Sequence, residues 1–298
     1  MKIVACPICD NNQLSFLNYK KNPSQENWIY DCFKDKTLSK CVKCSFTFTS
    51  ETFEKGSLSK YYNILYSKTK LARFKASQNY EFTARSYSHV NFIKTNLDFI
   101  KGMNILEIGP NQNGMIPSFS LYCKPNYFYY EQFEFPVIKY FGGKKIGDYF
   151  DKQVASKLGP DNKMDLIVLS HSLEHFEPEF IGDSVEAFKM ALKVNGHVSI
   201  EVPIENDIDL QPPHTVFFNV NNLSVLLEKY GFSIVATQSI KSPVINSNNF
   251  TNSATMPASI ITKIAKQFLS IILPRKIRLK LLKPYFDIKL KSLYDGRS

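Results

Sequence analysis

The sequence predicts a mixed α/β fold with a mainly parallel sheet, preceded by a small metal-binding module and followed by a basic helical tail. The first observation is that short apolar runs alternate with segments of helical periodicity after residue 101, a pattern that builds parallel sheets. The second is a set of two Cys-x-x-Cys pairs near the N-terminus. With 298 residues, the chain can hold one large domain and a smaller one.

Five apolar runs are candidates for strands, and two amphipathic segments are candidates for helices. Gly196 and Gly231 follow these two helices, at positions where glycine commonly ends a helix. The strands are expected at residues 104–108, 127–130, 165–170, 197–202 and 232–240, and the helices at residues 183–193 and 222–230.

Composition divides the chain into four parts. Residues 1–52 form the cysteine module, in which residues 28–30 and 46–49 alternate as short strands do. Residues 53–100 contain no proline and repeat apolar residues at helical spacing, which predicts a helical linker or lid. Residues 101–245 form the α/β domain, and residues 246–298 form a polar loop and the basic tail.

Four of the six cysteines form two pairs, Cys6 with Cys9 and Cys41 with Cys44, about thirty residues apart. Each Cys-x-x-Cys turn directs both sulfurs toward one ion, so the two turns together predict a tetrahedral four-thiolate zinc site. Such a site has no open position for water, which makes the zinc structural and a source of folding energy for a small module. The alternatives are a redox pair or four incidental cysteines.

The stretch Asn104-Ile-Leu-Glu-Ile-Gly-Pro-Asn-Gln-Asn-Gly114 is the most informative part of the α/β domain. An apolar strand ends in an acidic residue and turns at a glycine, which lets the backbone approach a ligand where a side chain would block it. Glu107 is expected to hold the ammonium group of an adenosyl ligand, and Gly109 to leave room for that ligand. A plain strand end is the alternative for this stretch taken alone.

Three more residues at strand ends extend this predicted site. Glu131 follows the second strand, where a carboxylate can accept hydrogen bonds from both hydroxyls of a ribose. Asp148 precedes two aromatic residues and can accept a hydrogen bond from an adenine amino group. Ser170, at the end of the third strand, completes the predicted cofactor site.

The segments Asp165-Leu-Ile-Val-Leu-Ser-His-Ser-Leu-Glu-His-Phe176 and Leu192-Lys-Val-Asn-Gly-His-Val-Ser-Ile-Glu-Val-Pro203 resemble the fourth and fifth strands of class I S-adenosylmethionine-dependent methyltransferases. Residues 214–232 resemble the late helix and sixth strand of that family. The resemblance covers residues 1 to about 240 and implies a Rossmann-like sheet, with S-adenosylmethionine as the cofactor of the site described above. The cysteine module is similar to that of the subgroup that includes sugar C-methyltransferases.

The chain departs from the family pattern in its first loop. Asn111 takes the place of a glycine two residues beyond Gly109, and Gly114 is a candidate for a shifted glycine. This departure is the basis for one alternative, a non-catalytic relative that keeps the fold as a scaffold.

Methyl transfer mainly requires that the two reactants are aligned, and a base is needed only where the nucleophile must lose a proton. His171, at a strand end, and His214, on a loop after Pro212-Pro213, are the predicted catalytic bases. His175 is a further candidate, and Glu201 is a candidate for binding substrate hydroxyls. A hydrogen-bonded structural histidine is the alternative for each imidazole.

The formal charge of +10 is concentrated in the tail. Ten lysines and arginines but only two aspartates lie beyond residue 258, so the tail carries +8 and the rest of the chain +2. Residues 260–272 repeat apolar residues on one helical face, which is typical of a helix that lies on an anionic membrane or packs on the protein. The nearly neutral remainder disfavours nucleic acid as a partner.

These features predict a methyltransferase that acts on a sugar or another small hydroxylated metabolite, in surface-polysaccharide biosynthesis. An RNA or protein methyltransferase is the other alternative, although the lack of an Asp/Asn-Pro-Pro-Tyr motif disfavours methylation of exocyclic amino groups of bases. No signal peptide or membrane-spanning run is recognised, so we expect a cytoplasmic protein, held at the inner face of the membrane by its tail. The sequence does not indicate an oligomeric state.

Overall fold

The computed structural model describes residues 1–19, 32–54, 56–58, 60–62, 76–111, 113–204 and 210–239. In the long helix that begins at residue 76, the side chains are described from residue 84 on. The chain divides into two compact units, Met1–Gln238 and Ser239–Ser298. The strand expected at residues 28–30 and the loop and basic tail expected at residues 246–298 lie outside the described residues.

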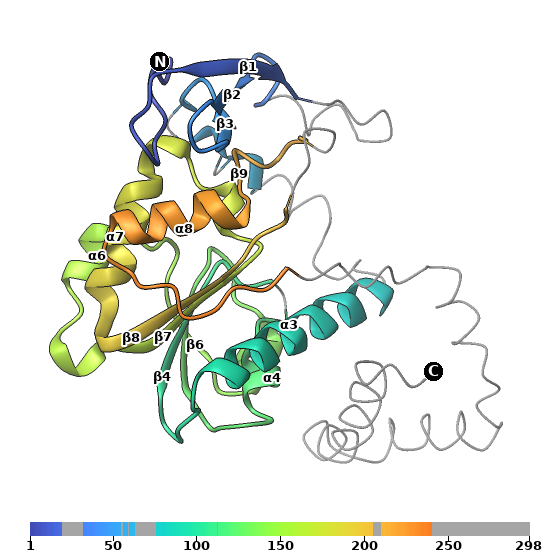
Figure 1. The fold of residues 1–298 in the computed structure, drawn as a ribbon. Helices are drawn as coiled ribbons and strands as arrows, with labels where there is room; N and C mark the ends of the chain where they lie inside the picture. The colour runs from blue at the N-terminus through green and yellow to red at the C-terminus, as the bar shows by residue number, and fades with distance from the viewer. Residues whose placement is uncertain are drawn as a thin grey trace. The chain divides into compact units, whose positions relative to one another are not determined.

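A five-stranded sheet forms the centre of the first unit (Figure 1). Its strands are β4 (Asn104–Ile108), β5 (Asn126–Tyr130), β6 (Lys144–Gly147), β7 (Met164–Ser170) and β8 (Leu192–Glu201). They run in the order β6-β5-β4-β7-β8, and each neighbouring pair is parallel. The strand order reverses between β4 and β7, and open α/β sheets bind their ligands beyond the carboxyl ends of the strands at such a point.

Helices cover both faces of this sheet (Figure 1). Successive residues of a strand point to opposite sides, so the apolar strands present side chains to the helices on each face. On one face, Ile105 and Leu166 pack with α3 (Ala76–Asn96) and α4 (Ile116–Phe119). On the other face, Leu106 and Ile167 pack with α7 (Ile181–Ala191) and α8 (Val220–Lys229). Each helix of the described residues is too short or too polar to span a lipid bilayer. The short helices are α5 (Pro136–Tyr140), α6 (Lys152–Ser156), η1 (Pro160–Asn162), η2 (Leu173–His175) and η3 (Pro178–Phe180).

The cysteine module contains a second, antiparallel sheet. Its strands, in spatial order, are β1 (Leu14–Asn18), β2 (Thr37–Cys41), β3 (Thr47–Thr49) and β9 (Val216–Phe217). The last of these strands comes from a segment that the sequence assigns to the α/β domain. The two sheets also share one apolar core, since Phe46 and Phe48 belong to the same cluster as Leu106. The ring centroids of Phe46 and Phe218 lie 5.2 Å apart.

Three of the expected strands are confirmed as β4, β5 and β7, and the fourth is part of the longer β8. The prediction that Gly196 ends a helix is wrong. Helix α7 ends at Ala191, and Gly196 lies inside β8, where a Cβ would be 3.0 Å from the carbonyl oxygen of Met164. Gly231, with a φ of +83°, follows α8 as predicted.

The fifth expected strand, at residues 232–240, is not formed by residues 232–239, the part of it that the structure describes. Phe232 and Ile234 pack against the apolar cluster, so alternate residues are partly buried although the backbone forms no ladder. The apolar pattern therefore misled the prediction, because it reflects partial burial of alternate residues and does not by itself show that a partner strand is present.

Candidate active site

The loop after β4 packs tightly against the loop after β7, and this contact explains the glycine at its start. Gly109 has a φ of +66°, a left-handed conformation that favours glycine. A Cβ at this position would lie 2.8 Å from Ser172 Oγ, which donates a hydrogen bond to the Gly109 carbonyl oxygen at 3.0 Å. The two loops are thereby fixed against each other where the strand order reverses.

Asn111, which departs from the expected glycine, closes the same loop. Its Oδ1 accepts hydrogen bonds from the backbone N–H groups of Asn113 at 2.9 Å and Gly114 at 3.2 Å. Asparagine side chains commonly stabilise turns in this way. Gly114 has a φ of +57°, and a Cβ there would lie 2.7 Å from Ile138 Cδ1. The second position that requires glycine is therefore residue 114, and Asn111 supports the turn.

Glu107 lies beneath this loop. Its side chain is 2% exposed, and Oε2 accepts hydrogen bonds from the Met115 N–H at 3.0 Å and from the Tyr127 hydroxyl. Burial raises the pKa of Glu107 to about 7, and the bonds from Tyr127 and Met115 offset this only in part. The bond from Met115 ties Glu107 to the loop, and the bond from Tyr127 ties it to β5, so its position favours an anchoring role over direct contact with a ligand.

The raised pKa of Glu107 predicts a pH dependence of stability. Its folded-state pKa of about 7 exceeds the ordinary value of 4.5, so the unfolded chain loses this proton first as pH rises. The contribution of Glu107 to the free energy of unfolding is expected to be fully present below pH 4.5 and to be lost as pH rises through 7, by on the order of 3 kcal/mol. Denaturant titrations across this range should show a smaller fall for Glu107→Gln. An equal fall of the free energy of unfolding with pH in Glu107→Gln and the unaltered protein would contradict the prediction. The control is Glu134→Gln, at a carboxylate that is 64% exposed.

Glu131 and Asp148 stand just beyond the carboxyl ends of β5 and β6. The Gly109 N–H donates to the carbonyl oxygen of Tyr130 at 3.1 Å, so the glycine loop adjoins Glu131. Burial raises the pKa of Glu131 to about 7, while Lys145 lowers it and Asp148 raises it further. Asp148 itself is 62% exposed and pairs with Lys145 at 2.7 Å. One shielded and one exposed carboxylate therefore flank this edge of the sheet.

At the ends of β7 and β8, Glu201 is the centre of a polar network. Its Oε2 accepts a hydrogen bond from Ser170 Oγ at 2.8 Å and lies 3.3 Å from His89 Nδ1. Burial alone would raise the pKa of Glu201, but the hydrogen bond and charge of His89 lower it to about 2. Glu201 is therefore ionised near neutral pH and acts as a hydrogen-bond acceptor. The Ser170 hydroxyl, predicted to face a cofactor, is directed to Glu201.

His171 adjoins the same network. It has a φ of 53°, a left-handed conformation that is uncommon for this residue and is concentrated at functional sites. Its Nε2 lies 3.1 Å from Arg85 Nη1, and its Nδ1 lies 3.4 Å from Glu174 Oε1. Because arginine only donates, Nε2 accepts this hydrogen bond, which assigns the ring proton to Nδ1. Partners on both sides thus hold His171 in one orientation.

Arg85 and His89 are site residues that sequence reasoning missed. Both lie on α3, and a spacing of four residues places them on one face of that helix. They reach His171 and Glu201, which are far away in the sequence. The sequence offered one signal for these two site residues. Arg85 and His89 are a basic residue and a histidine at helical spacing, in a helix that is only weakly amphipathic.

His175 and His214 lie together beside this network, with ring centroids 4.9 Å apart. Burial lowers the pKa of His175 to about 4, so this imidazole is neutral at neutral pH. The Tyr19 hydroxyl donates to the backbone carbonyl oxygen of His214 at 2.6 Å, which links the cysteine module to this loop. The structure therefore brings the predicted catalytic histidines to one end of β7.

Residues 84–237 match the family described as methyltransferase domain. The match spans slightly more than half of the chain. The chain belongs to this methyltransferase family. The predicted enzyme class, an S-adenosylmethionine-dependent methyltransferase, is confirmed. No curated protein matches the chain.

Solved structures of other methyltransferases are similar at a low level. The 1,6-didemethyltoxoflavin-N1-methyltransferase of Burkholderia thailandensis is 14% identical with a TM-score of 0.48, and the match covers 68% of this chain and 92% of that one. Phosphoethanolamine N-methyltransferase 2 of Haemonchus contortus is 13% identical with a TM-score of 0.45, covering 84% of this chain and 60% of that one. A SAM dependent methyltransferase of Archaeoglobus fulgidus is 16% identical with a TM-score of 0.41, and the match covers 65% of this chain and 90% of that one.

The methyltransferase holds its four paired cysteines in one cluster. The Sγ atoms of Cys6 and Cys44, and those of Cys9 and Cys41, are 3.5 Å apart, and all four lie within 4.8 Å of one another. The two turns have the same geometry, since the residue after each has a φ of 59° and donates its N–H to the carbonyl of the first cysteine at 2.9 Å. Zinc–sulfur bonds of about 2.3 Å place tetrahedral sulfurs about 3.8 Å apart, so the donor set fits one zinc ion.

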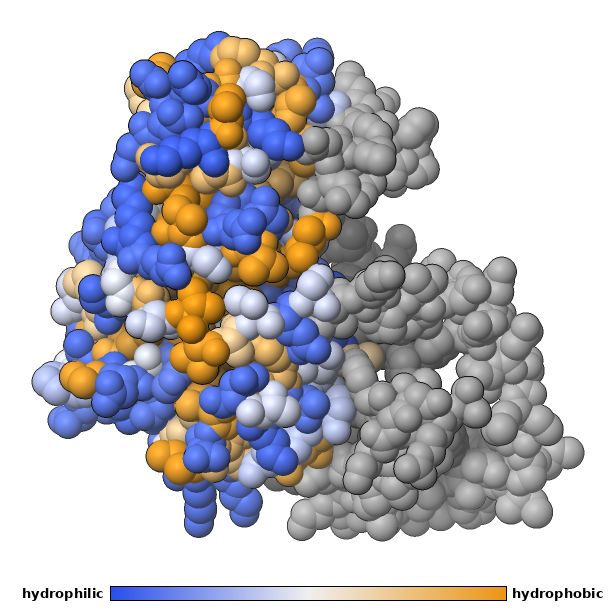
Figure 2. Space-filling model, viewed as in Figure 1, coloured by the Kyte–Doolittle hydropathy of each residue, from blue (hydrophilic) through white to orange (hydrophobic). Residues whose placement is uncertain are grey.

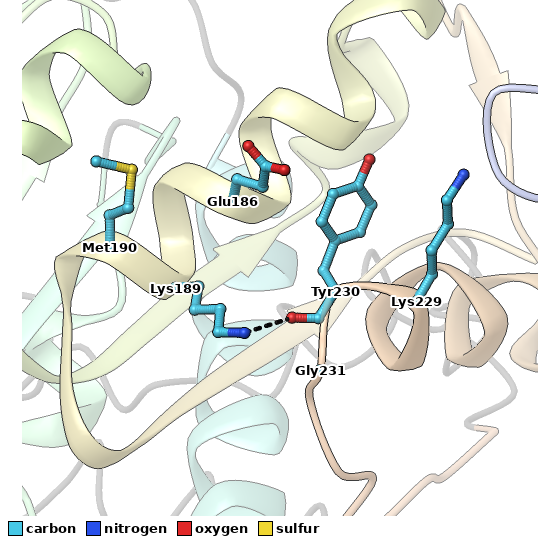
Figure 3. A pocket seen from close by; sticks show the side chains of 6 residues that line it. All are labelled: Glu186, Lys189, Met190, Lys229, Tyr230 and Gly231. Carbon is cyan, nitrogen blue, oxygen red and sulfur yellow. Dashed lines mark hydrogen bonds between the residues drawn. The ribbon is translucent and has the colours of Figure 1, made fainter.

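A hollow lies between α7 and the C-terminal end of α8 (Figure 3). Its charged groups have structural partners: Lys189 Nζ donates to the Tyr230 carbonyl oxygen at 3.0 Å, and Lys229 pairs with Asp10 at 2.8 Å. Apolar and polar residues are mixed over the face of the methyltransferase that Figure 2 shows. The hollow is lined by Glu186, Lys189, Met190, Lys229, Tyr230 and Gly231.

Proposed function

We propose that the methyltransferase transfers the methyl group of S-adenosylmethionine to a hydroxyl group of a small, sugar-like metabolite. The observation that carries this proposal is the pairing of a left-handed Gly109 with a shielded carboxylate, Glu131, at neighbouring strand ends. Glu131 accepts hydrogen bonds from both ribose hydroxyls, and the exposed Asp148 accepts one from the adenine amino group. Glu107 holds the loop that forms the wall of this site.

The polar network around Glu201 supports a hydroxylated substrate. An ionised Glu201, beside Ser170 and His89, offers acceptor oxygens next to the ends of β7 and β8. S-adenosylmethionine supplies a methyl group activated by a sulfonium sulfur, so the protein mainly aligns the reactants. The substrate oxygen would bond to the methyl carbon as the carbon–sulfur bond breaks. The hydroxyl proton would pass to the imidazole of His214, or to Nε2 of His171 once the substrate hydroxyl replaces Arg85 at that atom.

We further propose that the four cysteines hold a structural zinc ion. The matched geometry of the two turns supports this site, as does the fit of the sulfur spacing to one tetrahedral ion. Because the two sheets share one apolar core, zinc stabilises more of the chain than the module itself. Contact of the basic tail with an anionic membrane stays a prediction.

A product assay tests the proposed reaction. The protein is incubated with S-adenosylmethionine and either a panel of nucleotide sugars and polyols or RNA and peptide substrates, and S-adenosylhomocysteine is quantified. A sugar substrate is expected to raise its release well above the basal rate, and mass spectrometry should place the new methyl group on oxygen. Release with only RNA or peptide, or methylation on carbon or nitrogen, would refute the proposed substrate chemistry.

A further inference from the structure

Glu174, His175 and His214 form a second group of possible metal ligands, separate from the four cysteines. One ligand atom of each residue lies within 4.8 Å of the others. Glu174 and His175 belong to η2, which follows β7, whereas His214 comes from the loop before β9. Thr215 joins these two segments, since its N–H and Oγ1 donate to the Glu174 carbonyl oxygen at 2.9 and 3.2 Å. The three residues are therefore held in a fixed frame.

The carboxylate of Glu174 is the feature that points to a cation. The residue is 1% exposed, and among the described residues its Oε2 makes no hydrogen bond. His171 Nδ1 lies 3.4 Å from Oε1. Burying a carboxylate without hydrogen bonds is costly, and buried carboxylates are normally paired with a charge or bound to a metal. A cation among Glu174, His175 and His214 would offset this cost.

The two imidazoles are suitably arranged to complete the site. His175 Nδ1 lies 3.5 Å from the carbonyl oxygen of Pro213, which leaves Nε2 as the ligand atom. Metal-binding histidines commonly donate their other N–H to a backbone carbonyl in this way. Both histidines are half-buried, so the group is not sealed within the core.

We propose that Glu174, His175 and His214 bind a divalent cation of the Mn²⁺ to Zn²⁺ series, with open positions for a substrate oxygen. Two imidazoles and one carboxylate suit these cations, whereas Ca²⁺ and Mg²⁺ prefer oxygen ligands throughout. Bonds of about 2.0–2.2 Å place ligand atoms about 3 to 4 Å apart, so small side-chain rotations bring the three groups to an ion.

The location links this cation to methyl transfer. Ser172, two residues before Glu174, packs against Gly109, so the metal group adjoins the cofactor site. Resting on the proposed function, the cation would hold a substrate hydroxyl and make its proton easier to remove. His214 is then a metal ligand, which leaves His171 as the group that accepts the proton, at Nε2, once the substrate hydroxyl replaces Arg85 at that atom.

Metal counting in the full-length protein tests the proposal. After equilibrium dialysis against Zn²⁺, Glu174→Gln and His214→Gln are each expected to bind one equivalent fewer than the unaltered protein, and His197→Gln, in β8 outside the group, to bind the same number. Thiolate sites do not select Mn²⁺, so the unaltered protein should bind one equivalent of Mn²⁺ at the proposed site. Glu174→Gln and His214→Gln should each lose that equivalent. The half-exposed His214 provides the test if the variant at buried Glu174 does not fold.

Unchanged Zn²⁺ and Mn²⁺ counts in the folded variants would overturn the metal site. Calorimetric titration of the same proteins with S-adenosylmethionine separates this result from the proposed function. A protein that binds the extra cation but not S-adenosylmethionine keeps the metal site and contradicts the methyl-transfer proposal. If the protein binds S-adenosylmethionine but the variants show no difference in metal count, the metal site is contradicted and the methyl-transfer proposal is kept.

Discussion

Replacing Cys41 by serine is expected to remove one equivalent of zinc and to lower the thermal midpoint of the whole first unit, Met1–Gln238, by on the order of 10 °C. A zinc site that loses a ligand loses folding energy that the small module cannot replace. The parallel sheet is expected to lose stability as well, because Phe46 and Phe48 of the module pack in the same cluster as Leu106 of that sheet. Calorimetry and metal analysis of the purified protein measure both effects.

The same substitution should reduce methyl transfer more than cofactor binding. The module touches the loop of His214 through the Tyr19 hydroxyl at 2.6 Å, and the Thr49 N–H donates to the Thr215 carbonyl oxygen at 2.8 Å. Cys32→Ala, at a half-buried cysteine outside the cluster, is the control and should keep its zinc. A Cys41→Ser protein with normal zinc content and an unchanged midpoint would show that the cysteines are not a metal site.

Glu131→Gln is expected to weaken binding of S-adenosylmethionine by roughly tenfold to a hundredfold. Hydrogen bonds to an ionised group contribute about 1.5–3 kcal/mol, and the amide oxygen that replaces the carboxylate is a weaker acceptor. Isothermal titration calorimetry measures the difference, with Glu134→Gln as the control, since Glu134 is 64% exposed and lies three residues away. Equal affinities in Glu131→Gln and the unaltered protein would contradict the assigned role.

The raised pKa of Glu131 adds a pH dependence to this prediction. Burial raises that pKa to about 7, and the ribose hydroxyls bind the ionised form best, so affinity should increase as pH rises through 7. Lys145 and Asp148 face the same carboxylate with opposite effects on its pKa. Glu131→Gln should abolish the dependence, whereas Glu134→Gln should keep it.

The sequence located the parallel sheet and its ligand-binding edge because both have local signals. Strand β4 is a short apolar run that ends at a glycine with a positive φ, and Glu131 directly follows β5. The pairing of the four cysteines was likewise predictable from spacing. These features depend on residues that are close together in the chain, where strand period and turn chemistry are informative.

Features that depend on tertiary contacts could not be predicted. Arg85 and His89 reach His171 and Glu201 only because α3 packs on the sheet. Strand β9 pairs with β3 across more than 160 residues, and no local pattern marks that partner. Glu107 faces a ligand in the sequence-based prediction, yet the Tyr127 hydroxyl and the Met115 N–H bind it beneath the loop. Its burial follows from the neighbouring strand, not from its own segment.

We expect the edge formed by the ends of β4 and β5 to bind S-adenosylmethionine. A crystal structure of the protein with S-adenosylhomocysteine, the product form of the cofactor, tests it most directly. Both ribose hydroxyls are expected to lie within hydrogen-bond distance of the Glu131 carboxylate, beside the loop that begins at Gly109. Density for the ligand elsewhere on the protein, or none at saturating concentration, would contradict it.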